Sequence, residues 1–358
     1  MVRDLSSGEE GEEPYDHLLV ATGARVAPPN LPGMESGGIH SPYSLEAAEV
    51  LRRELEEHRP RRAVIVGGGH IGLEFADALR RLDLDVTLVG RRSEPMRTLD
   101  PDMGALVARA LEKMEVTLLL GEAVTGFEST GGHVREVVTE HRHVPADLVV
   151  MGAGVRPNSD LAREAGLPLG VFDAIKVDDH MRTPVEGIWA AGDCAETVQL
   201  VTGRPFWVSL ATVAGKQGRV AGTNLGGGEA TFPGTLGTAI TKVGPVEVAR
   251  TGLQEREIEE LGIPFVTAKA TSPTRSRYYP GAEPMTVKLL AEKGSGRLLG
   301  GQIVGGQGAG KRIDIVATAL HGRMTVDQVT ALDLAYSPPF SSAWDPVALA
   351  ARELSAIG

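Results

Sequence analysis

Three glycines spaced for phosphate binding lie between an apolar run and a helix-like segment. Gly67, Gly69 and Gly72 follow AVIV (63–66). In such a GxGxxG turn, the first glycine permits the tight turn and the second lets the backbone approach a pyrophosphate. The third lets the helix pack closely on the strand, with its N-terminus directed at the phosphates. Because a strand, a helix and a second strand flank the glycines, the pattern predicts a dinucleotide-binding unit rather than a chance glycine turn.

The second strand of this unit, DVTLV (85–89), ends in basic residues. An acidic residue normally binds the adenine-ribose 2′-hydroxyl at this position. This chain instead has Gly90, Arg91 and Arg92. Two guanidinium groups suit a 2′-phosphate, so the sequence favours NADPH over NADH. The alternative is that both arginines only face solvent.

Two polar residues accompany the glycine turn. We place Glu74 in the first turn of the helix, where the helix dipole favours a carboxylate. The same position would also lie near the nicotinamide of a bound nucleotide, and the sequence does not separate these interpretations. We interpret His70, between two of the glycines, as a spacer or lid rather than as a general base.

Two further strand ends carry groups suited to binding a polyol. The segment TPVEGIWAAGDC (183–194) predicts a strand whose carboxyl end presents Asp193, a hydrogen-bond acceptor. The strand in YDHLLV is followed by a similar turn, Ala21, Thr22 and Gly23. Neither pattern is informative alone. Together, flanking an inserted βαβ unit, they are specific.

The elements that must position these residues follow from periodicity and from Gly/Pro punctuation. We expect helices over 39–60, from the glycine turn to about 82, over 102–113 and after Trp207. We expect strands at 63–66, 85–89, 116–120, 147–151 and 187–193, with a hairpin across Gly131 and Gly132. After a linker at 226–230, the pattern predicts strands near 238–250, 264–270, 285–291 and 297–305 and then two helices, the order of an α+β domain.

Composition narrows the class of protein. The chain has 358 residues, 42% hydrophobic and 23% charged, and its charge is 36 basic minus 47 acidic residues, or −11. An acidic protein is a poor partner for nucleic acid or anionic membranes. No apolar run approaches the roughly 18 residues of a membrane span, and the acidic N-terminus is not a signal or transit peptide, so we expect a cytoplasmic protein. The single cysteine, Cys194, excludes an intrachain disulfide and a cysteine-based zinc site, and we expect no metal.

The order of the motifs ATG, GGGHIGLE, GAGVRPN (152–158) and AAGD resembles that of the pyridine nucleotide–disulfide oxidoreductases. The resemblance implies an α/β fold with two Rossmann-like dinucleotide-binding domains, the FAD one incomplete, and a C-terminal α+β dimerisation domain. The implied segments are 1–40 and 156–229 for FAD, 41–155 for NAD(P)H and 230–358 for the dimer interface. The implied cofactors are FAD and NADPH or NADH. The family pattern also places Gly154 at the cofactor, Asp193 on the flavin ribityl chain, and Leu210 and Ala211 near the flavin ring.

The C-terminal third is similar to coenzyme A-disulfide reductases and their persulfide-reductase relatives, through RYYPGAEPM (277–285), GKRIDIVATAL (310–320) and LDLAYSPPFSSAWDPV (332–347). The resemblance implies that Tyr336 and either Tyr278 or Tyr279 reach the flavin site of the other subunit of a homodimer. A phenol there could protonate the leaving thiolate of coenzyme A. Aromatic packing at a dimer interface is the alternative. Lys311 and Arg312 suit either coenzyme A phosphates or a solvated helix start.

The family pattern begins with an FAD-binding glycine turn and a redox cysteine. Neither motif is found before Tyr15 in this sequence. We expect on the order of a hundred residues to be absent, more than one βαβ unit of roughly 30, and we interpret Cys194 as structural. The implied reaction is hydride transfer from NADPH to FAD and then reduction of a cysteine–coenzyme A mixed disulfide, a cycle that we do not expect this chain to complete alone. We expect the chain to be poorly soluble or poor in flavin. The alternatives are an NADH oxidase or peroxidase of the same fold, or a noncatalytic NAD(P)H-binding, dimerising fragment.

Overall fold

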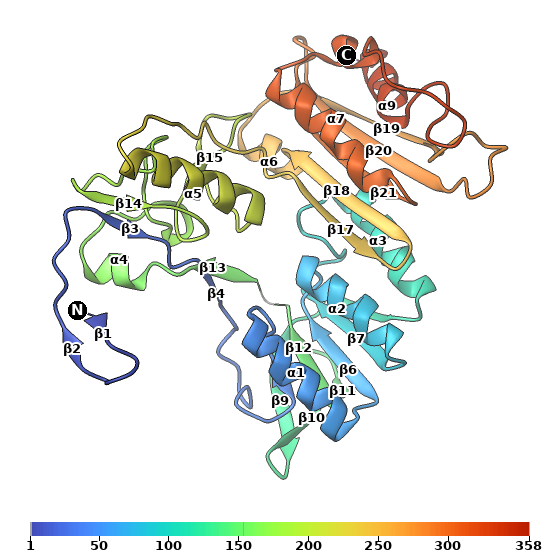
Figure 1. The fold of residues 1–358 in the computed structure, drawn as a ribbon. Helices are drawn as coiled ribbons and strands as arrows, with labels where there is room; N and C mark the ends of the chain where they lie inside the picture. The colour runs from blue at the N-terminus through green and yellow to red at the C-terminus, as the bar shows by residue number, and fades with distance from the viewer. Residues whose placement is uncertain (1, 153, 358) are drawn as a thin grey trace. The chain divides into compact units, whose positions relative to one another are not determined.

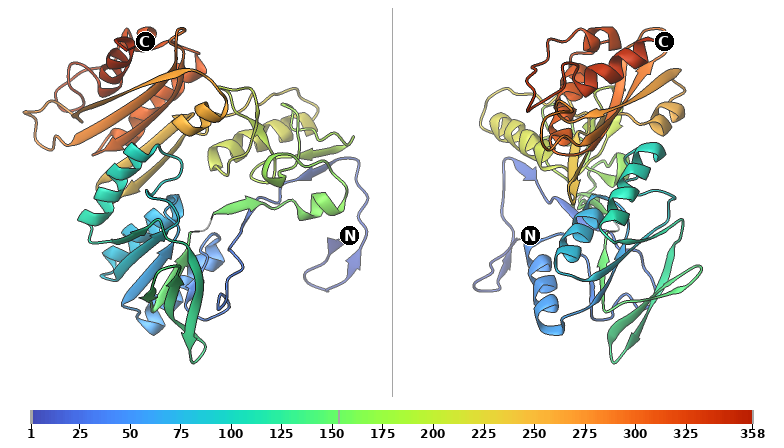
Figure 2. Two further views of the ribbon diagram at one scale, coloured as in Figure 1. Left: turned by 180° about the vertical axis from the view of Figure 1, so that it is seen from behind. Right: turned by 90° about the vertical axis from the view of Figure 1, so that its right-hand side faces the viewer.

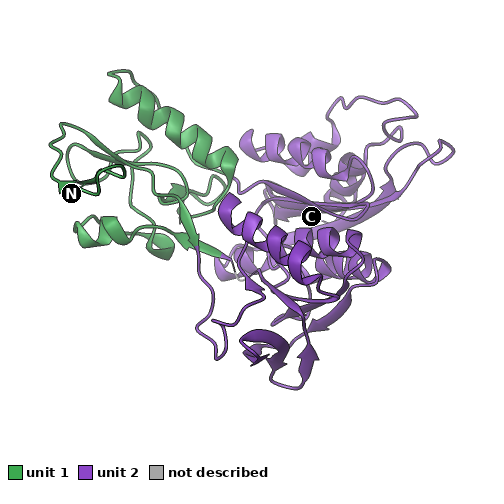
Figure 3. Ribbon diagram, turned by 60° about the horizontal axis from the view of Figure 1, so that its bottom comes forward, with its two compact units in different colours: residues 1–25, 155–235 green, residues 26–154, 236–358 purple. Residues whose placement is uncertain are grey.

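The computed structural model describes residues 2–152 and 154–357. The chain divides into two compact units (Figure 3). Unit 1 comprises Met1–Arg25 and Val155–Thr235, and unit 2 comprises Val26–Gly154 and Leu236–Gly358.

The N-terminal part of unit 2 is built on a five-stranded parallel sheet with the strand order β5-β12-β6-β7-β8 (Figure 1). A three-stranded antiparallel sheet, β11-β10-β9, accompanies it. The elements are β5 (Ile39–His40), α1 (Leu45–His58), β6 (Arg62–Val66), α2 (His70–Arg81), β7 (Asp85–Gly90), α3 (Pro101–Lys113), β8 (Thr117–Leu120), β9 (Val124–Thr130), β10 (His133–Thr139), β11 (His143–Pro145) and β12 (Leu148–Met151).

The two faces of the parallel sheet are covered by different layers. Side chains of helices α1, α2 and α3, among them Leu51, Leu73 and Met103, form one core with the sheet. Phe127 and Val137 of the antiparallel sheet form a second core with the alternate residues of the same strands. Both faces are buried, as is usual for a parallel sheet.

The C-terminal part of unit 2 is a five-stranded antiparallel sheet, β17-β18-β21-β20-β19. Helices α7 and α9 pack on this sheet (Figure 1, Figure 2). Val243, Val248 and Val304 share a core with α2 and α3 of the preceding domain. The elements are β17 (Ala239–Val243), β18 (Val246–Gly252), α6 (Glu255–Glu260), β19 (Phe265–Pro273), β20 (Pro284–Glu292), β21 (Leu298–Gly305), α7 (Ala309–His321), α8 (Val326–Thr330) and α9 (Pro346–Ser355).

Unit 1 centres on a two-stranded parallel sheet of β3 and β14, with helix α5 among the elements that follow. Two small apolar clusters form its interior, one around Val20 and Ile175 and one around Val213 and Val220. The elements are β1 (Val2–Arg3), β2 (Glu10–Gly11), β3 (Leu18–Val20), β4 (Ala24–Val26, its last residue beyond the boundary), β13 (Val155–Pro157), α4 (Asp160–Glu164), the 3₁₀ turn η1 (Val171–Asp173), β14 (Ile188–Ala190), β15 (Thr197–Val198), β16 (Pro205–Phe206) and α5 (Ala211–Leu225).

The structure corrects three predicted elements. The helix expected over 39–60 begins at Leu45, because Ile39 and His40 pair with β12 and the Ser44 side chain caps the helix by accepting from the Ala47 N–H. The strand expected over 238–250 is a hairpin that turns at Gly244, whose φ is 55°. Three helices rather than two follow the last strand. No helix in the described ranges is long and apolar enough to span a bilayer.

Candidate functional site

The glycine turn after β6 has the geometry that the motif predicts. Gly67 has φ 111°, and a Cβ there would meet the Gly152 carbonyl oxygen at 2.6 Å. A Cβ on Gly72 would meet the Gly67 carbonyl oxygen at 2.0 Å, so only glycine lets α2 pack on the turn. A Cβ on Gly69 would meet nothing within 4 Å. Gly69 caps α2 without a side-chain hydrogen bond, so the first amide groups of α2 are available to a pyrophosphate.

The sequence predicted Glu74 in the first turn of its helix, and the structure shows that this prediction is wrong. Helix α2 begins at His70, which makes Glu74 its fifth residue, and the helix-dipole effect is confined to the first turn. The Glu74 carboxylate instead accepts a hydrogen bond of 2.8 Å from the Thr241 hydroxyl of β17. Glu74 therefore links the parallel sheet domain to the C-terminal sheet. Burial lowers the pKa of His70 more than the nearby Glu74 carboxylate raises it.

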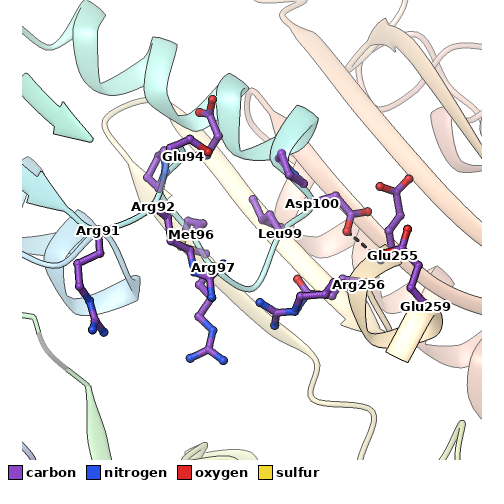
Figure 4. A pocket seen from close by; sticks show the side chains of 14 residues that line it. Arg91, Arg92, Glu94, Met96, Arg97, Leu99, Asp100, Glu255, Arg256 and Glu259 are labelled. Atoms are coloured by element: carbon purple, nitrogen blue, oxygen red, sulfur yellow. Dashed lines mark hydrogen bonds between the residues drawn. The ribbon is translucent and has the colours of Figure 1, made fainter. Parts of the chain in front are cut away.

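A pocket of about 510 Å³ opens beside the end of β7 (Figure 4). Arg91 and Arg92 line it, and the side chains of Arg91 and Arg97 extend to the same side of their segment. Arg256 of α6 adds a fourth guanidinium group. Within the described residues, Arg91, Arg92 and Arg97 form no salt bridge, so their charges are available to an anion. Arg97 and Arg256 were not predicted from the sequence as pocket residues. Arg97 lies six residues after Arg91 in the same segment, so its proximity in sequence could have identified it. Nothing in the sequence indicates that Arg256 lies near this segment.

Acidic residues also line the pocket, and a buried lysine pairs with two of them. Asp100 and Glu255 both pair with the Lys288 ammonium group, at 3.0 and 2.8 Å. The Asp100 carboxylate also accepts from the Glu255 N–H at 2.9 Å. Glu94 and Glu259 also line the pocket and form no salt bridge within the described residues. The part of the pocket that suits an anion is therefore the end next to β7, where Arg91, Arg92 and Arg97 have no salt-bridge partner.

In unit 1, the strand-end residues form a connected set. The Thr22 hydroxyl donates to the Asn158 carbonyl, and the Asn158 N–H donates to the Gly23 carbonyl at 2.9 Å, with Gly23 at φ 71°. Ala21 directly follows β3, which pairs in parallel with β14. Unit 1 thus holds the ATG turn against the segment that begins at Val155. Gly154, at φ 89°, ends the preceding segment in unit 2, and Ala153 of the same motif lies outside the described residues.

Asp193 follows β14 and faces the start of α5. Its carboxylate accepts from the Ser209 hydroxyl, and its carbonyl accepts from the Trp207 indole at 2.8 Å. Leu210 is the N-cap of α5 and Ala211 its first residue, and no side chain caps this helix. A carboxylate beside uncapped helix amides offers both acceptors and donors, the set that a polyol phosphate chain requires.

Cys194 is fully buried, and its thiol donates to the carbonyl oxygens of Val20 and Ala191, both at 3.4 Å. A buried thiol without an activating cation is inert, which agrees with the structural role that we predicted. We expect the native chain not to react with Ellman's reagent within minutes, whereas denaturant releases one thiol per chain. Rapid reaction of the native thiol would contradict this role.

The three tyrosines are exposed on two loops of unit 2. Tyr278 and Tyr279 lie between β19 and β20, and Tyr336 lies between α8 and α9; their exposed fractions are 77%, 37% and 51%. The Ser276 N–H donates to the Pro338 carbonyl at 3.0 Å, which ties the two loops together. Large apolar surface at such positions is typical of an interface.

Arg312 braces these loops rather than facing solvent. Its guanidinium group pairs with Asp345 at 2.8 Å and donates to the carbonyl oxygens of Thr274 and Phe340 at 3.0 and 2.7 Å. Lys311, in contrast, is 80% exposed and pairs with Asp314. Arg312 is therefore a structural link between the tyrosine loops, and its donors are not free for a coenzyme A phosphate.

Comparison with known proteins defines the class. The family model for pyridine nucleotide-disulphide oxidoreductases matches residues 1–218, and the model for the dimerisation domain of these enzymes matches 238–348. The chain belongs to the pyridine nucleotide-disulphide oxidoreductases, whose members are NAD(P)H-dependent flavoprotein oxidoreductases.

Individual relatives narrow the comparison. The chain is 39% identical, over 97% of its length and 78% of the relative, to the NAD(P)H sulfur oxidoreductase (CoA-dependent) of Pyrococcus abyssi. It is 35% identical, over 97% of its length and 77% of the relative, to an NADH oxidase of Methanocaldococcus jannaschii. A solved NAD-dependent persulfide reductase of A. fulgidus is 43% identical with a TM-score of 0.94. That match covers 97% of this chain but only 65% of the solved one, slightly under two thirds.

Proposed function

We propose that this chain provides the NADPH-binding and subunit-interface parts of an FAD-dependent NAD(P)H:disulfide oxidoreductase that acts on a coenzyme A disulfide or persulfide. The observation that carries the nucleotide part is the glycine turn, with Gly67 and Gly72 irreplaceable on steric grounds and Gly69 open. The names of the Pyrococcus and A. fulgidus relatives support the sulfur substrate.

The arginines at the end of β7 support NADPH as the nucleotide. Arg91 and Arg92 follow β7, the strand whose end binds the adenine ribose in this type of fold. A 2′-phosphate there would pair with guanidinium groups that have no carboxylate of their own, and such charge-assisted bonds are stronger than neutral ones. NADH would leave these charges without a partner.

We expect the double substitution Arg91→Glu and Arg92→Glu to weaken NADPH binding by at least roughly 100-fold, since two charge-assisted contacts of about 1.5–3 kcal/mol each are replaced by repulsion. NADH affinity should change by less than about 3-fold. Titration calorimetry with both nucleotides measures this. Arg109→Glu, an exposed arginine of α3 outside the pocket, is the matched control. An equal loss for NADH and NADPH would show that the arginines do not read the 2′-phosphate.

The residues of unit 1 fit the FAD that the family uses. Asp193 would accept from ribityl hydroxyls, the α5 amides beyond Leu210 would face a polar part of the flavin, and Thr22 with Gly23 would line the adjoining turn. When bound, the flavin supplies the exchange between hydride chemistry and thiolate chemistry. Cys194 is too buried to exchange disulfides, so sulfur reduction needs a thiol that is not among the residues of this chain. Tyr336 and Tyr278 or Tyr279 would supply the proton for a departing coenzyme A thiolate.

The visible spectrum of the purified chain, with and without added FAD and then NADPH, tests this proposal. We expect little flavin as purified. A flavin band that forms with added FAD and bleaches with NADPH supports the flavin–nicotinamide part of the enzyme. NADPH binding without any flavin band favours the noncatalytic, nucleotide-binding alternative. Binding of neither ligand would overturn both.

The match to the M. jannaschii NADH oxidase keeps oxygen as a second candidate for the electron acceptor. The FAD-supplemented chain should then consume NADPH in air without a sulfur substrate, and anaerobic conditions should stop it. Because sulfur reduction needs a thiol that this chain does not contain, reduced flavin that persists in air would favour the sulfur substrate over oxygen.

We also propose a homodimer. The match to the dimerisation-domain model supports it, as do the exposed aromatic side chains of unit 2, namely Tyr278, Tyr279, Tyr336, Phe340 and Trp344. Sedimentation equilibrium should give twice the chain mass of 37.8 kDa.

A further inference from the structure

Three imidazoles and one carboxylate meet in the parallel-sheet domain, away from the residues assigned to the nucleotide. Glu54 and His58 lie one turn apart on α1, His40 ends β5 and His133 begins β10. The His133 Nε2 atom lies 2.8 Å, and the His58 Nδ1 atom 3.3 Å, from Glu54 Oε1. The donor atoms of Glu54, His58 and His133 all lie within 4.8 Å of one another.

This spacing suits a metal ion. Zinc binds imidazole nitrogen and carboxylate oxygen at roughly 2.0–2.2 Å in tetrahedral geometry, which places neighbouring ligand atoms about 3.3–3.6 Å apart. The separations from Glu54 Oε1 lie close to this range, so small side-chain movements would complete the site. Two imidazoles, one carboxylate and an open fourth position form a ligand set that binds Zn²⁺ in proteins.

His40 gives an independent indication that the cluster lacks a component. Its side chain is 10% exposed, and its Nε2 atom is buried without a hydrogen-bond partner in the described part of the chain. Glu54 Oε2 is 3.9 Å away, too far for a hydrogen bond. A buried polar atom without a partner costs free energy, and a small movement of the Glu54 carboxylate would remove that cost.

The backbone is shaped to admit the His133 ring. A Cβ on Gly38, which has φ 80°, would lie 2.3 Å from His133 Cε1. The His133 Nδ1 atom faces the Val134 carbonyl at 3.4 Å. The Nε2 atom contacts Glu54 Oε1 at 2.8 Å, and in the tautomer with the proton on Nδ1 its lone pair is available to a metal ion. A hydrogen-bonded outer nitrogen is also the usual arrangement of a metal-bound histidine.

We propose that Glu54, His58 and His133 bind one Zn²⁺, and that His40 positions Glu54 by donating to its second carboxylate oxygen. This departs from the expectation of no metal. His58 is 56% exposed, so the fourth position faces solvent and takes water. The ion would join α1 to the hairpin of β9 and β10, whose turn is formed by Gly131 and Gly132. It therefore acts on the stability of this domain and is independent of the sulfur substrate.

The test uses the full chain without an affinity tag, stripped of metal with a chelator and titrated with ZnCl₂ against a chromophoric zinc indicator. We expect one Zn²⁺ per chain, a rise in melting temperature, and tetrahedral Co²⁺ absorption bands on cobalt substitution. His58→Ala should weaken binding by at least roughly 100-fold, and His40→Ala by about 10- to 100-fold, the range for outer partners of ligands. His58 is exposed at the end of α1, so its variant should fold, as circular dichroism would show.

His143→Ala is the matched control, because His143 forms a comparable but exposed cluster with Glu128 and Glu136. It should leave zinc affinity unchanged. No stoichiometric zinc, or zinc affinity insensitive to His58→Ala, would show that the cluster is only a hydrogen-bonded ion pair. Loss of zinc in His143→Ala alone would place the ion at the other cluster. Any of these three results overturns the proposal.

Discussion

Replacing Lys288 with methionine is expected to lower the free energy of unfolding by about 3–5 kcal/mol, the usual cost of breaking a buried ion pair. The Lys288 side chain is 4% exposed, and its ammonium group contacts Asp100, Asp102 and Glu255 at 3.0, 2.8 and 2.8 Å. Asp100 is itself 2% exposed. The variant would leave this carboxylate buried without its cation.

The network also joins the two parts of unit 2. Lys288 comes from β20, Asp100 and Asp102 from the start of α3, and Glu255 from α6. The Asp100 carboxylate further accepts from the Gln302 side-chain amide at 2.7 Å. Loss of Lys288 should therefore loosen the contact between the nucleotide-binding domain and the C-terminal sheet as well as lower stability.

Urea unfolding of the purified chain, followed by circular dichroism, measures this effect. Lys269→Met is the matched control: Lys269 pairs with the same Asp102 at 2.9 Å but is 44% exposed. An exposed pair contributes less than about 1 kcal/mol, so the control should stay close to wild type. Equal losses for both variants would mean that burial of the network does not determine its strength.

The contribution of this network also depends on pH in a defined sense. Burial opposes the charge of Lys288, but its hydrogen bonds to the three carboxylates outweigh burial and raise its pKa above 10.5. Burial raises the pKa of Asp102, but the hydrogen bonds from Lys288 and Lys269 outweigh it and lower the pKa below 3.8. The stabilisation is thus complete between pH 3.8 and 10.5. It is lost as the pH falls through the folded pKa of Asp102 or rises through that of Lys288, and the variant's deficit should shrink outside this window.

The substitution Gly72→Ala is expected to reduce both nucleotide affinity and stability. The new methyl group would overlap the Gly67 carbonyl oxygen, so α2 must move away from the turn that it packs against. Overpacking of this kind costs about 1–3 kcal/mol. Because the moved amides no longer face the pyrophosphate, we expect NADPH affinity to fall by at least roughly 100-fold, as for the loss of two or more charge-assisted hydrogen bonds.

Gly69→Ala separates the two effects. Gly69 has an extended conformation and open space where a Cβ would lie, so alanine should cost less than about 1 kcal/mol, an ordinary N-cap effect. The methyl group would nevertheless stand where the backbone must approach a phosphate, and NADPH affinity should fall by at least about 10-fold. Calorimetric titration and urea unfolding of both variants check this. Normal NADPH binding by the Gly69→Ala variant would show that the pyrophosphate does not bind at this turn.

The local part of this architecture was predictable from the sequence because its signals are local. The unit consists of a β-branched run, the three spaced glycines and a helix, which follow one another within a short stretch of chain. The structure confirms β6, the turn and α2. Glu74 was assigned to the wrong turn because the pattern does not show that α2 begins as early as His70. The Gly244 turn was missed because apolar residues continue on both sides of it.

The long-range features were not predictable because no periodicity connects their residues. Lys288 meets Asp100 only through the packing of two separate sheets. Arg256 reaches the pocket from a six-residue helix that the sequence analysis did not identify. The cluster of His40, Glu54, His58 and His133 depends on how β5 and the β9–β10 hairpin lie against α1. In each case, single residues look like ordinary surface charges until the tertiary structure brings them together.

We propose that this chain binds a nicotinamide nucleotide and that Arg91 and Arg92 select NADPH. The most direct test is calorimetric titration of the purified wild-type chain with NADPH and with NADH in the same buffer. We predict one NADPH per chain, bound at least about 10-fold more tightly than NADH, a difference of about 1.4 kcal/mol. Failure to bind either nucleotide, or tighter binding of NADH, would contradict this account.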